Sequence, residues 1–159
     1  MGIITDEARA WAQRSYPSYE YPVLARDIRK YAQAIGETDP IHLDPAAAHA
    51  AGFRDIVAPP LFPYVIRLHA ASLQGLEADG SPSEDVPPLP TTGAMAGETA
   101  MRLGAPIHAG DVITVDKELV EMYEKEGRSG ALVFVKHRFT FRNQADEMVM
   151  VEEFTRIYR

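Results

Sequence analysis

Hydrophobic positions recur at helical spacing in the first half of the chain and at every second position in the second half. Over 23–35 they fall every three or four residues, which predicts a helix ended by the glycine that follows. A second, short helix is predicted after Asp44, because this residue can act as an N-cap, Pro45 suits the first helical position and Gly52 can end the helix. We therefore expect the intervening segment, 37–43, to be a loop held at both ends.

A third helix is predicted in the middle of the chain, where 61–73 is apolar on nearly every side. A helix that is hydrophobic all round is usually buried, and Pro59 and Pro60 suit its entrance. Its polar interruptions are Arg67, His69 and Ser72. The stretch 78–93 holds four prolines and no periodic pattern, so we expect a long surface loop within one domain rather than a boundary between two.

The second half of the chain alternates hydrophobic and polar positions, which predicts antiparallel strands. The expected order is an irregular strand over 95–111 that ends in a turn at Gly110–Asp111, a strand over 112–123, a hairpin connection over 124–130, a strand over 131–143, a turn over 144–147 and a last strand over 148–159. One face of the strand over 131–143 is expected to carry Val133, Val135, His137, Phe139 and Phe141. The last strand is expected to place Val149, Val151 and Ile157 on one face.

Helices come first and a run of antiparallel strands follows, which is typical of the α+β class. One apolar helix beside a long antiparallel sheet predicts a sheet wrapped around that helix. We expect a single domain over 1–159, because 159 residues suffice for one core but not for two good ones.

Composition narrows the function classes. The net charge of −7 argues against nucleic acid as a partner, since proteins that bind it usually carry a basic face. No apolar run approaches the roughly 18 residues of a membrane helix, and the N-terminus lacks the pattern of a secretory signal. The absence of cysteine excludes disulfides, thiolate metal sites and cysteine nucleophiles, and it fits a reducing cytoplasm, where we expect the protein.

Chemistry-bearing residues crowd into the predicted loop. Glu37, Asp39, His42 and Asp44 lie within eight positions between two helices. Such a segment is either an ordinary capping turn or a place where protons are moved by a carboxylate and an imidazole. Asp44 is explained by its N-cap role, and an Asp before Pro40 is a common turn pair. Neither a zinc-binding spacing nor a glycine-rich phosphate loop is present, so we expect no metal and no cofactor.

Gly36 begins a stretch, Gly36-Glu37-Thr38-Asp39-Pro40-Ile41-His42, that resembles the G-D-x-N-P-[LIV]-H motif of the MaoC-like hot-dog family of (R)-specific enoyl hydratases and hydroxyacyl dehydratases. Three further stretches resemble the FAS1-like dehydratase, or MaoC N-terminal, branch of that family. They are GFRDIVAPPLF (52–62), YEKEGRSGALVFV (123–135) and RNQADE (142–147). The resemblance covers about 15–159 and implies a hot-dog fold.

The resemblance implies that this chain hydrates enoyl thioesters, or dehydrates 3-hydroxyacyl thioesters, carried by CoA or acyl carrier protein. Glu37 and His42 would be the proton-transfer pair, and Asp39 a supporting or substitute carboxylate. Two departures from the family pattern fall here, since the family's Asp is Glu37 and its Asn is Asp39. The added methylene of Glu37 requires the loop to compensate by about 1 Å, and the second carboxylate can raise the pKa of the first.

A third departure concerns substrate binding. Where catalytic members often have a His-Gly pair whose glycine amide serves the thioester oxyanion, this chain has Ala58-Pro59-Pro60-Leu61. Proline has no amide proton, so Leu61 becomes the candidate oxyanion donor, with Ala58 and Pro60 beside it as candidate substrate-binding residues.

Two other functions stay open. The chain can be a non-catalytic accessory hot-dog subunit that shapes the acyl tunnel of a heteromeric dehydratase, a role that the proline pair favours and His42 opposes. A hot-dog thioesterase is the second alternative, although such enzymes commonly carry a carboxylate on the central helix and 61–74 contains none. Because a single hot-dog sheet leaves an edge strand exposed, we expect a homodimer or heterodimer with another hot-dog subunit.

Overall fold

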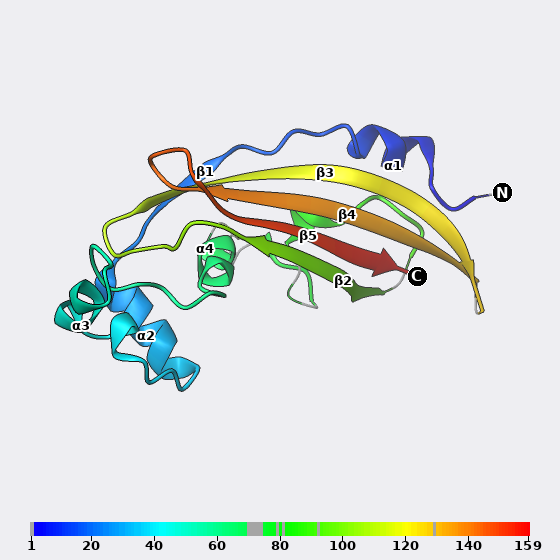
Figure 1. The fold of residues 1–159 in the computed structure, drawn as a ribbon. Helices are drawn as coiled ribbons and strands as arrows, with labels where there is room; N and C mark the ends of the chain where they lie inside the picture. Colours follow the sequence, from blue (N-terminus) through cyan, green and yellow to red (C-terminus); the bar gives the residue numbers. More distant parts are fainter. Residues whose placement is uncertain (1, 70–74, 79, 81, 92, 129) are drawn as a thin grey trace.

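The computed structural model describes residues 2–69, 75–78, 80, 82–91, 93–128 and 130–159. Its described residues form a five-stranded antiparallel sheet with the order β1-β3-β4-β5-β2 (Figure 1). The strands are β1 (Tyr19–Pro22), β2 (Ala94–Leu103), β3 (Val112–Gly127), β4 (Gly130–Arg142) and β5 (Met148–Tyr158). The helices are α1 (Asp6–Trp11), α2 (Ala25–Ala34), α3 (Pro45–Ala50) and α4 (Pro63–His69), with the short 3-10 helices η1 (Pro40–His42) and η3 (Ser83–Asp85). The α+β class is confirmed.

The helix signals near the predicted loop are confirmed. Gly36 and Gly52 end α2 and α3 in the left-handed region, with φ of 73° and 90°, which glycine adopts without a steric penalty. Asp44 caps α3 by accepting a hydrogen bond from the Ala46 amide at 3.0 Å. The prediction of a plain loop over 37–43 is incomplete, because Pro40–His42 forms the helical turn η1.

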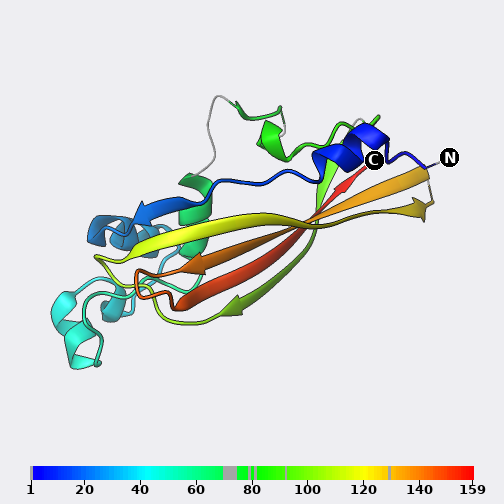
Figure 2. The ribbon, with the colours of Figure 1, turned by 90° about the horizontal axis from the view of Figure 1, so that it is seen from above.

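The helices α1, α4 and η3 lie on one side of the curved sheet (Figure 2). Two apolar clusters fill the space between them and the sheet. The larger cluster is centred on Phe62 and Ile66 and reaches Phe139 and Phe141 of β4. The smaller cluster contains Val133, Val135 and Tyr158, with residues of 3–11 and 86–89 packed against it. The predicted inward face of β4 is confirmed, since Val133, Val135, His137, Phe139 and Phe141 are all buried.

A buried ion pair joins α4 to the sheet. The Glu152 side chain is 0% exposed, and Arg67 Nη1 donates to both of its carboxylate oxygens at 2.8 Å. The Tyr64 hydroxyl donates to Glu152 Oε1 at 3.0 Å. The Arg67 guanidinium also lies 5.2 Å from the ring centre of Phe139 and 5.5 Å from that of Phe154. The helix is therefore fixed on the sheet by charge as well as by apolar contact.

The prediction for the central helix needs correction. It begins at Pro63 rather than at residue 61, it is described as far as His69, and 70–73 lie outside the described residues. Its burial on all sides is wrong for the described part, because Leu68 is 67% exposed while Ile66 is fully buried. The sheet covers only one side of this short helix, so the apolar residues on the other side face solvent in the single chain.

One strand prediction was wrong in its bounds, and another left the buried face undetermined. The expected hairpin connection over 124–130 is mostly strand, because β3 and β4 pair as far as Gly127 and Gly130. In β5 the expected set does not share one environment: Val149 is buried, where the register between β4 and β5 shifts, whereas Val151 and Ile157 are half-buried. Met150, Glu152 and Tyr158 are buried on the other face. Both faces of β5 carry apolar residues, and the buried face is the one with the carboxylate that Arg67 pairs. Alternation alone therefore could not indicate which face of β5 is buried.

The prolyl segment over 78–93 is only partly the surface loop that was predicted. Its described residues include η3, and the Gly93 amide donates to the Arg159 carbonyl at 3.1 Å. Val86 and Leu89 pack against the smaller apolar cluster. This segment thus helps to cover the end of the sheet that α4 does not reach. Residues 79, 81 and 92 lie outside the described part.

We predict that Arg67→Met lowers the free energy of unfolding by about 3–5 kcal/mol, because it leaves the buried Glu152 carboxylate without a positive charge. Equilibrium unfolding in urea measures this loss. The slope of the unfolding free energy against urea concentration should stay unchanged.

The control is the double variant Arg67→Met/Glu152→Leu, which removes both charges and should recover most of the lost stability. A double variant as unstable as the single one would show that packing, rather than the stranded carboxylate, accounts for the loss.

Candidate functional site

His42 is held rigidly at the centre of the predicted site. It ends η1, its side chain is buried, and its Nδ1 donates to the Val57 carbonyl at 2.6 Å. The Val57 amide in turn donates to the Ile41 carbonyl at 3.0 Å. Both backbone groups of Val57 therefore bind η1. A carbonyl can only accept, so the proton lies on Nδ1, and in the neutral imidazole Nε2 keeps its lone pair.

The two candidate carboxylates bind the backbone of their own loop. Glu37 Oε1 accepts hydrogen bonds from the amides of Thr38 and Asp39 at 2.8 and 3.0 Å. Asp39 Oδ1 accepts from the Ile41 amide at 3.1 Å and so caps η1. The amides of Asp39 and Thr38 lower the pKa of Glu37, and the nearby charge of His42 contributes less. Both carboxylates thus stabilise the turn that carries His42.

The structure brings Glu37, Asp39 and His42 together on one loop. Within the described residues, neither carboxylate forms a hydrogen bond with the His42 imidazole. A pKa lowered by backbone amides keeps Glu37 ionised at neutral pH and makes it a weak base. In this conformation the Thr38 and Asp39 amides must release Glu37 before its carboxylate can take up a proton.

The residues of the candidate substrate-binding segment, 58–61, differ in whether they have a backbone amide that a ligand could use. The Ala58 amide donates to the Ile107 carbonyl at 2.8 Å, so it is already used within the fold. Pro60 and Leu61 are exposed. Among the described residues, no backbone acceptor is found for the Leu61 amide. Leu61 is therefore the residue in 58–61 whose amide can be offered to a ligand.

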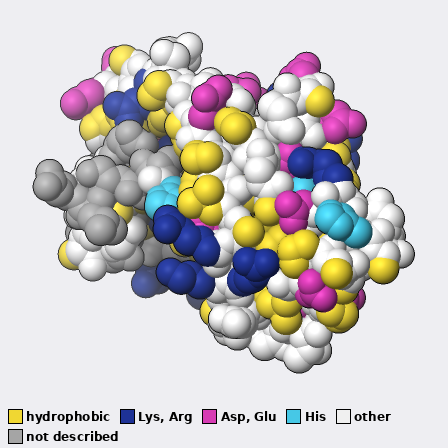
Figure 3. All heavy atoms as spheres, turned by 90° about the vertical axis from the view of Figure 1, so that its left-hand side faces the viewer, with side chains coloured by type: hydrophobic (Ala, Val, Ile, Leu, Met, Phe, Trp, Pro, Cys, Tyr) yellow, Lys and Arg dark blue, Asp and Glu magenta, His cyan; other side chains and the backbone are white. Residues whose placement is uncertain are grey.

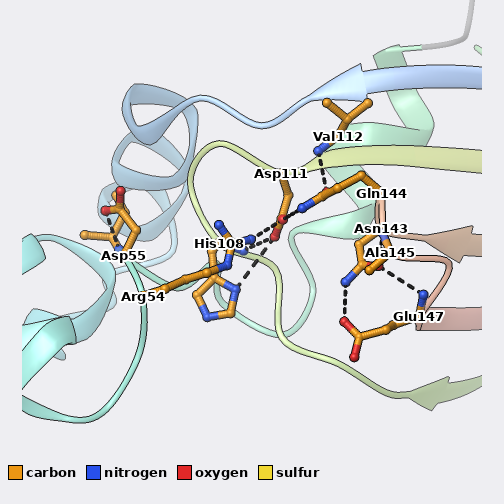
Figure 4. Close-up of polar contacts among 10 residues, drawn as sticks. Arg54, Asp55, His108, Asp111, Val112, Asn143, Gln144, Ala145 and Glu147 are labelled. Carbon is orange, nitrogen blue, oxygen red and sulfur yellow. Dashed lines mark hydrogen bonds and ion pairs between the residues drawn. The ribbon is translucent and has the colours of Figure 1, made fainter.

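A buried carboxylate that the sequence analysis missed, Asp111, lies among Arg54, His108 and Gln144 (Figure 4). The Asp111 side chain is fully buried; it accepts from the His108 amide at 2.7 Å and from Gln144 Nε2 at 2.8 Å, and it forms an ion pair with Arg54. His108 Nδ1 lies 3.7 Å from the same carboxylate. The sequence signal was a Gly-Asp pair, which was interpreted only as a turn.

The cluster around Asp111 connects to His42 through the backbone. An isolated bridge pairs His108 with Val57, the residue whose carbonyl holds the His42 imidazole. The Ala109 amide donates to the Ile56 carbonyl at 3.1 Å. Burial lowers the pKa of His108, and the charge of Arg54 lowers it further. Asp111 therefore fixes the turn that supports 56–58, and that segment fixes His42.

The surface at this end of the molecule carries basic side chains beside hydrophobic, acidic and histidine side chains (Figure 3). Arg26, Arg29 and Lys30 follow one another at helical spacing along α2, next to the loop. The described residues contain no group of three or more His, Asp or Glu placed to hold a metal ion. None of the described helices is long and apolar enough to cross a membrane.

Comparison of the sequence with protein families finds a match to the family described as "FAS1-like, dehydratase domain region", over residues 10–152. A UPF0336 protein of Thermobifida fusca is 31% identical over 120 residues, which cover 75% of this chain and 74% of that protein. A UPF0336 protein of Clavibacter michiganensis is 39% identical over 94 residues, which cover 59% of this chain and 58% of that protein.

Solved structures confirm the expected hot-dog fold. A chain of the ChsH1–ChsH2 complex from Mycobacterium tuberculosis superposes with a TM-score of 0.74 at 22% identity, covering 96% of this chain and 93% of that one. A chain of the HadBC (3R-hydroxyacyl-ACP dehydratase) complex from the same organism gives a TM-score of 0.67 at 22% identity, covering 90% and 92%. Both of these structures are complexes of two different subunits.

We predict that Asp111→Asn destabilises the protein by about 2–3 kcal/mol. The His108 amide and Gln144 Nε2 both donate to Asp111, so one of these two buried donors would face the new NH₂ group instead of an oxygen acceptor. Hydrogen exchange should accelerate at the His108 and Ala109 amides, and urea unfolding should give the energetic loss.

The matched control is Asp146→Asn, the same chemical change at an exposed turn residue with a φ of 60°, a conformation that Asn tolerates. This control should be neutral. Equal effects of the two substitutions would mean that burial of Asp111 is not the cause.

Proposed function

Because the chain belongs to the FAS1-like dehydratase domain family, we propose that it interconverts trans-2-enoyl and (R)-3-hydroxyacyl thioesters of CoA or acyl carrier protein. The observation that carries this proposal is the hydrogen bond from His42 Nδ1 to the Val57 carbonyl. It sets the tautomer and orientation of the imidazole, which is what a general base for water requires.

In the hydration direction, His42 Nε2 takes a proton from a water molecule while the water oxygen bonds to Cβ of the enoyl group. The electron pair of the Cα=Cβ bond moves toward the thioester carbonyl, and Cα then receives a proton. The thioester itself makes Cα acidic, so the reaction needs no cofactor. Dehydration follows the same path in reverse.

The remaining roles are assigned by position. We assign the Cα proton to Glu37, with Asp39 as the supporting or substitute carboxylate. In hydration Glu37 must first take up a proton and then delivers it to Cα, and His42 afterwards releases to solvent the proton that it took from water. In dehydration the ionised Glu37 removes the Cα proton. To act, Glu37 must give up its hydrogen bonds to the Thr38 and Asp39 amides. The Leu61 amide is the oxyanion donor, and Ala58 and Pro60 border the thioester. The basic residues of α2 suit the phosphates of CoA or of a carrier protein's prosthetic group.

An accessory role in a heteromeric dehydratase is the second candidate. Two observations favour it: both loop carboxylates are bound to backbone amides, and the similar solved chains come from complexes of two different subunits. A thioesterase is less well supported, since 61–74 carries no carboxylate that could activate water.

We predict that His42→Ala lowers the turnover of crotonyl-CoA hydration by 100-fold or more, as expected for loss of a general base. His42→Gln is the companion variant, because its side-chain amide can still donate to the Val57 carbonyl and so preserve the loop.

Both His42 variants should keep the wild-type circular dichroism spectrum, and full activity in either folded variant would refute the assignment. Glu37→Gln and Asp39→Asn, compared side by side, identify the acting carboxylate by the larger loss of turnover. Equal, mild losses would mean that neither residue transfers the proton.

We also predict a dimer in which two sheets join along β2. This strand lies at the edge of the sheet, and nearly all of its residues are exposed. Met101 and Leu103 are 44% and 51% exposed beside α4, where Leu61 is also exposed. Light scattering at micromolar concentration should give twice the chain mass of 17.6 kDa.

The double variant Met101→Glu/Leu103→Glu should be monomeric, whereas Val120→Glu, which changes an exposed apolar residue of β3, should leave the dimer intact. A wild-type monomer with full activity would refute the proposed dimer. Activity that develops only after addition of a second hot-dog subunit would identify the chain as the accessory partner.

A further inference from the structure

The outer face of the sheet is the face opposite to α1, α4 and η3, so none of these helices covers it (Figure 2). A groove of about 700 Å³ lies on this face, over the neighbouring strands β4, β5 and β2. Its described lining includes no residue of 37–42 or 58–61. The short side chains of Ala100, Thr140 and Val151 lie among longer ones in this lining, which accounts for the hollow.

Two arginines border the groove from β4. Arg138 and Arg142 lie two positions before and after Thr140, so the three side chains share one face of the strand. Phe139 and Phe141 alternate with them and are buried on the inner face, so the three point outward. Successive residues on one face of a strand are about 7 Å apart, and a ligand over Thr140 is therefore within reach of both guanidiniums.

A third arginine borders the groove from β2. Arg102 is registered opposite Val151 of β5, and Val151 is registered opposite Thr140 of β4. Neighbouring strands lie about 4.8 Å apart, so the backbone of Arg102 is about 10 Å from that of Thr140, across the width of the groove. Guanidiniums thus border the short side chains on three sides.

Arg138 is fixed in place by two carboxylates. Its Nε and Nη2 donate to Glu153 Oε1 at 3.0 and 2.7 Å, and its Nη1 donates to Glu118 Oε1 at 2.7 Å. These carboxylates compensate its charge and hold its guanidinium still. A guanidinium has five N–H groups, so Arg138 can still donate to a ligand.

The other two arginines are not compensated in this way. Arg142 Nη1 lies 3.6 Å from Asp146 Oδ1, beyond hydrogen-bond distance, and the Asp146 side chain is 86% exposed. Such an exposed pair contributes little. Arg102 is exposed and forms no ion pair with any carboxylate in the described part of the chain. Glu153, the one acidic residue of the described lining, is already bonded to Arg138.

Two available guanidiniums beside a hydroxyl suit a phosphate group. A phosphate monoester carries a charge of about −1.5 to −2 at pH 7 and offers three acceptor oxygens, and arginine binds it through paired hydrogen bonds. A carboxylate has one charge and would leave one arginine unmatched. Met148 and Val151 add apolar surface to the lining, and the volume lies within the range of small-molecule sites.

We propose that this outer groove binds a small-molecule phosphate monoester with an apolar body. Its phosphate lies between Arg102 and Arg142 and accepts a hydrogen bond from the Thr140 hydroxyl, and its body packs against Met148 and Val151. The proposed dimer joins the edges of β2 and leaves this face open. The site does not depend on the proposed reaction at His42.

Nuclear magnetic resonance titration of the purified full chain with phenyl phosphate tests the proposal. The titration is done at pH 8, where the probe is a dianion, and at low salt, because salt screens exposed charges. The amide signals of Arg102, Thr140 and Val151 should shift together. Inorganic phosphate, which lacks the body, should bind at least 5-fold more weakly, and phenol, which lacks the charge, should not shift these signals.

The double variant Arg102→Gln/Arg142→Gln should weaken binding of phenyl phosphate at least 10-fold. The matched control Arg9→Gln/Arg128→Gln removes the same two charges from exposed positions outside the groove and should leave binding unchanged. Ala100→Tyr, at an exposed strand position, should also weaken binding, because its ring fills the hollow.

Three results would each overturn the proposal: absence of phenyl phosphate binding, equal affinity for inorganic phosphate, or undiminished binding in the folded Arg102→Gln/Arg142→Gln or Ala100→Tyr protein. A protein that binds phenyl phosphate in the groove but does not hydrate crotonyl-CoA would refute only the proposed reaction.

Discussion

The pairing of Arg67 with Glu152 is the constraint on which the arrangement of this molecule depends. A carboxylate on the buried face of β5 is too costly to remain there without a positive partner. Arg67 supplies that partner from the last turn of α4, so the ion pair fixes this side of the helix against the sheet. With α4 fixed in this way, Phe62 and Ile66 point into the larger apolar cluster. The segment before the helix contributes Ile56 and Ala58 to the same cluster.

The segment before α4 connects the helix to the candidate site through backbone hydrogen bonds. Residues 56–58 bind the 107–109 segment on one side and η1 on the other. The buried Asp111 carboxylate fixes the 107–109 segment that 56–58 contacts. Val57 makes the contact with η1. His42 is thus oriented by a chain of backbone hydrogen bonds that begins at a buried carboxylate. The loop could not hold its imidazole in this way through its own three residues of 3-10 helix.

The sequence predicted what depends on local chemistry and missed what depends on distant partners. Gly36, Asp44 and Gly52 end or cap helices through their own backbone preferences, so the boundaries of α2 and α3 could be predicted. The buried face of β5 could not, because Glu152 is stable there only through a helix 85 residues away in sequence. Asp111 was overlooked for the same reason, since its partners come from three separate segments.

The loop carboxylates show how one added methylene changes the chemistry that a motif can perform. The longer side chain of Glu37 folds back onto the amides of Thr38 and Asp39, which hold its charge and lower its pKa. Those amides stabilise the turn only while the carboxylate remains there, so catalysis by Glu37 must compete with the order of its own loop. Asp39 faces the same competition as the cap of η1. His42 does not, because its bond to Val57 uses Nδ1 and leaves Nε2 for the proposed proton transfer. The imidazole is therefore the one member of the set that can act without disturbing the structure that positions it.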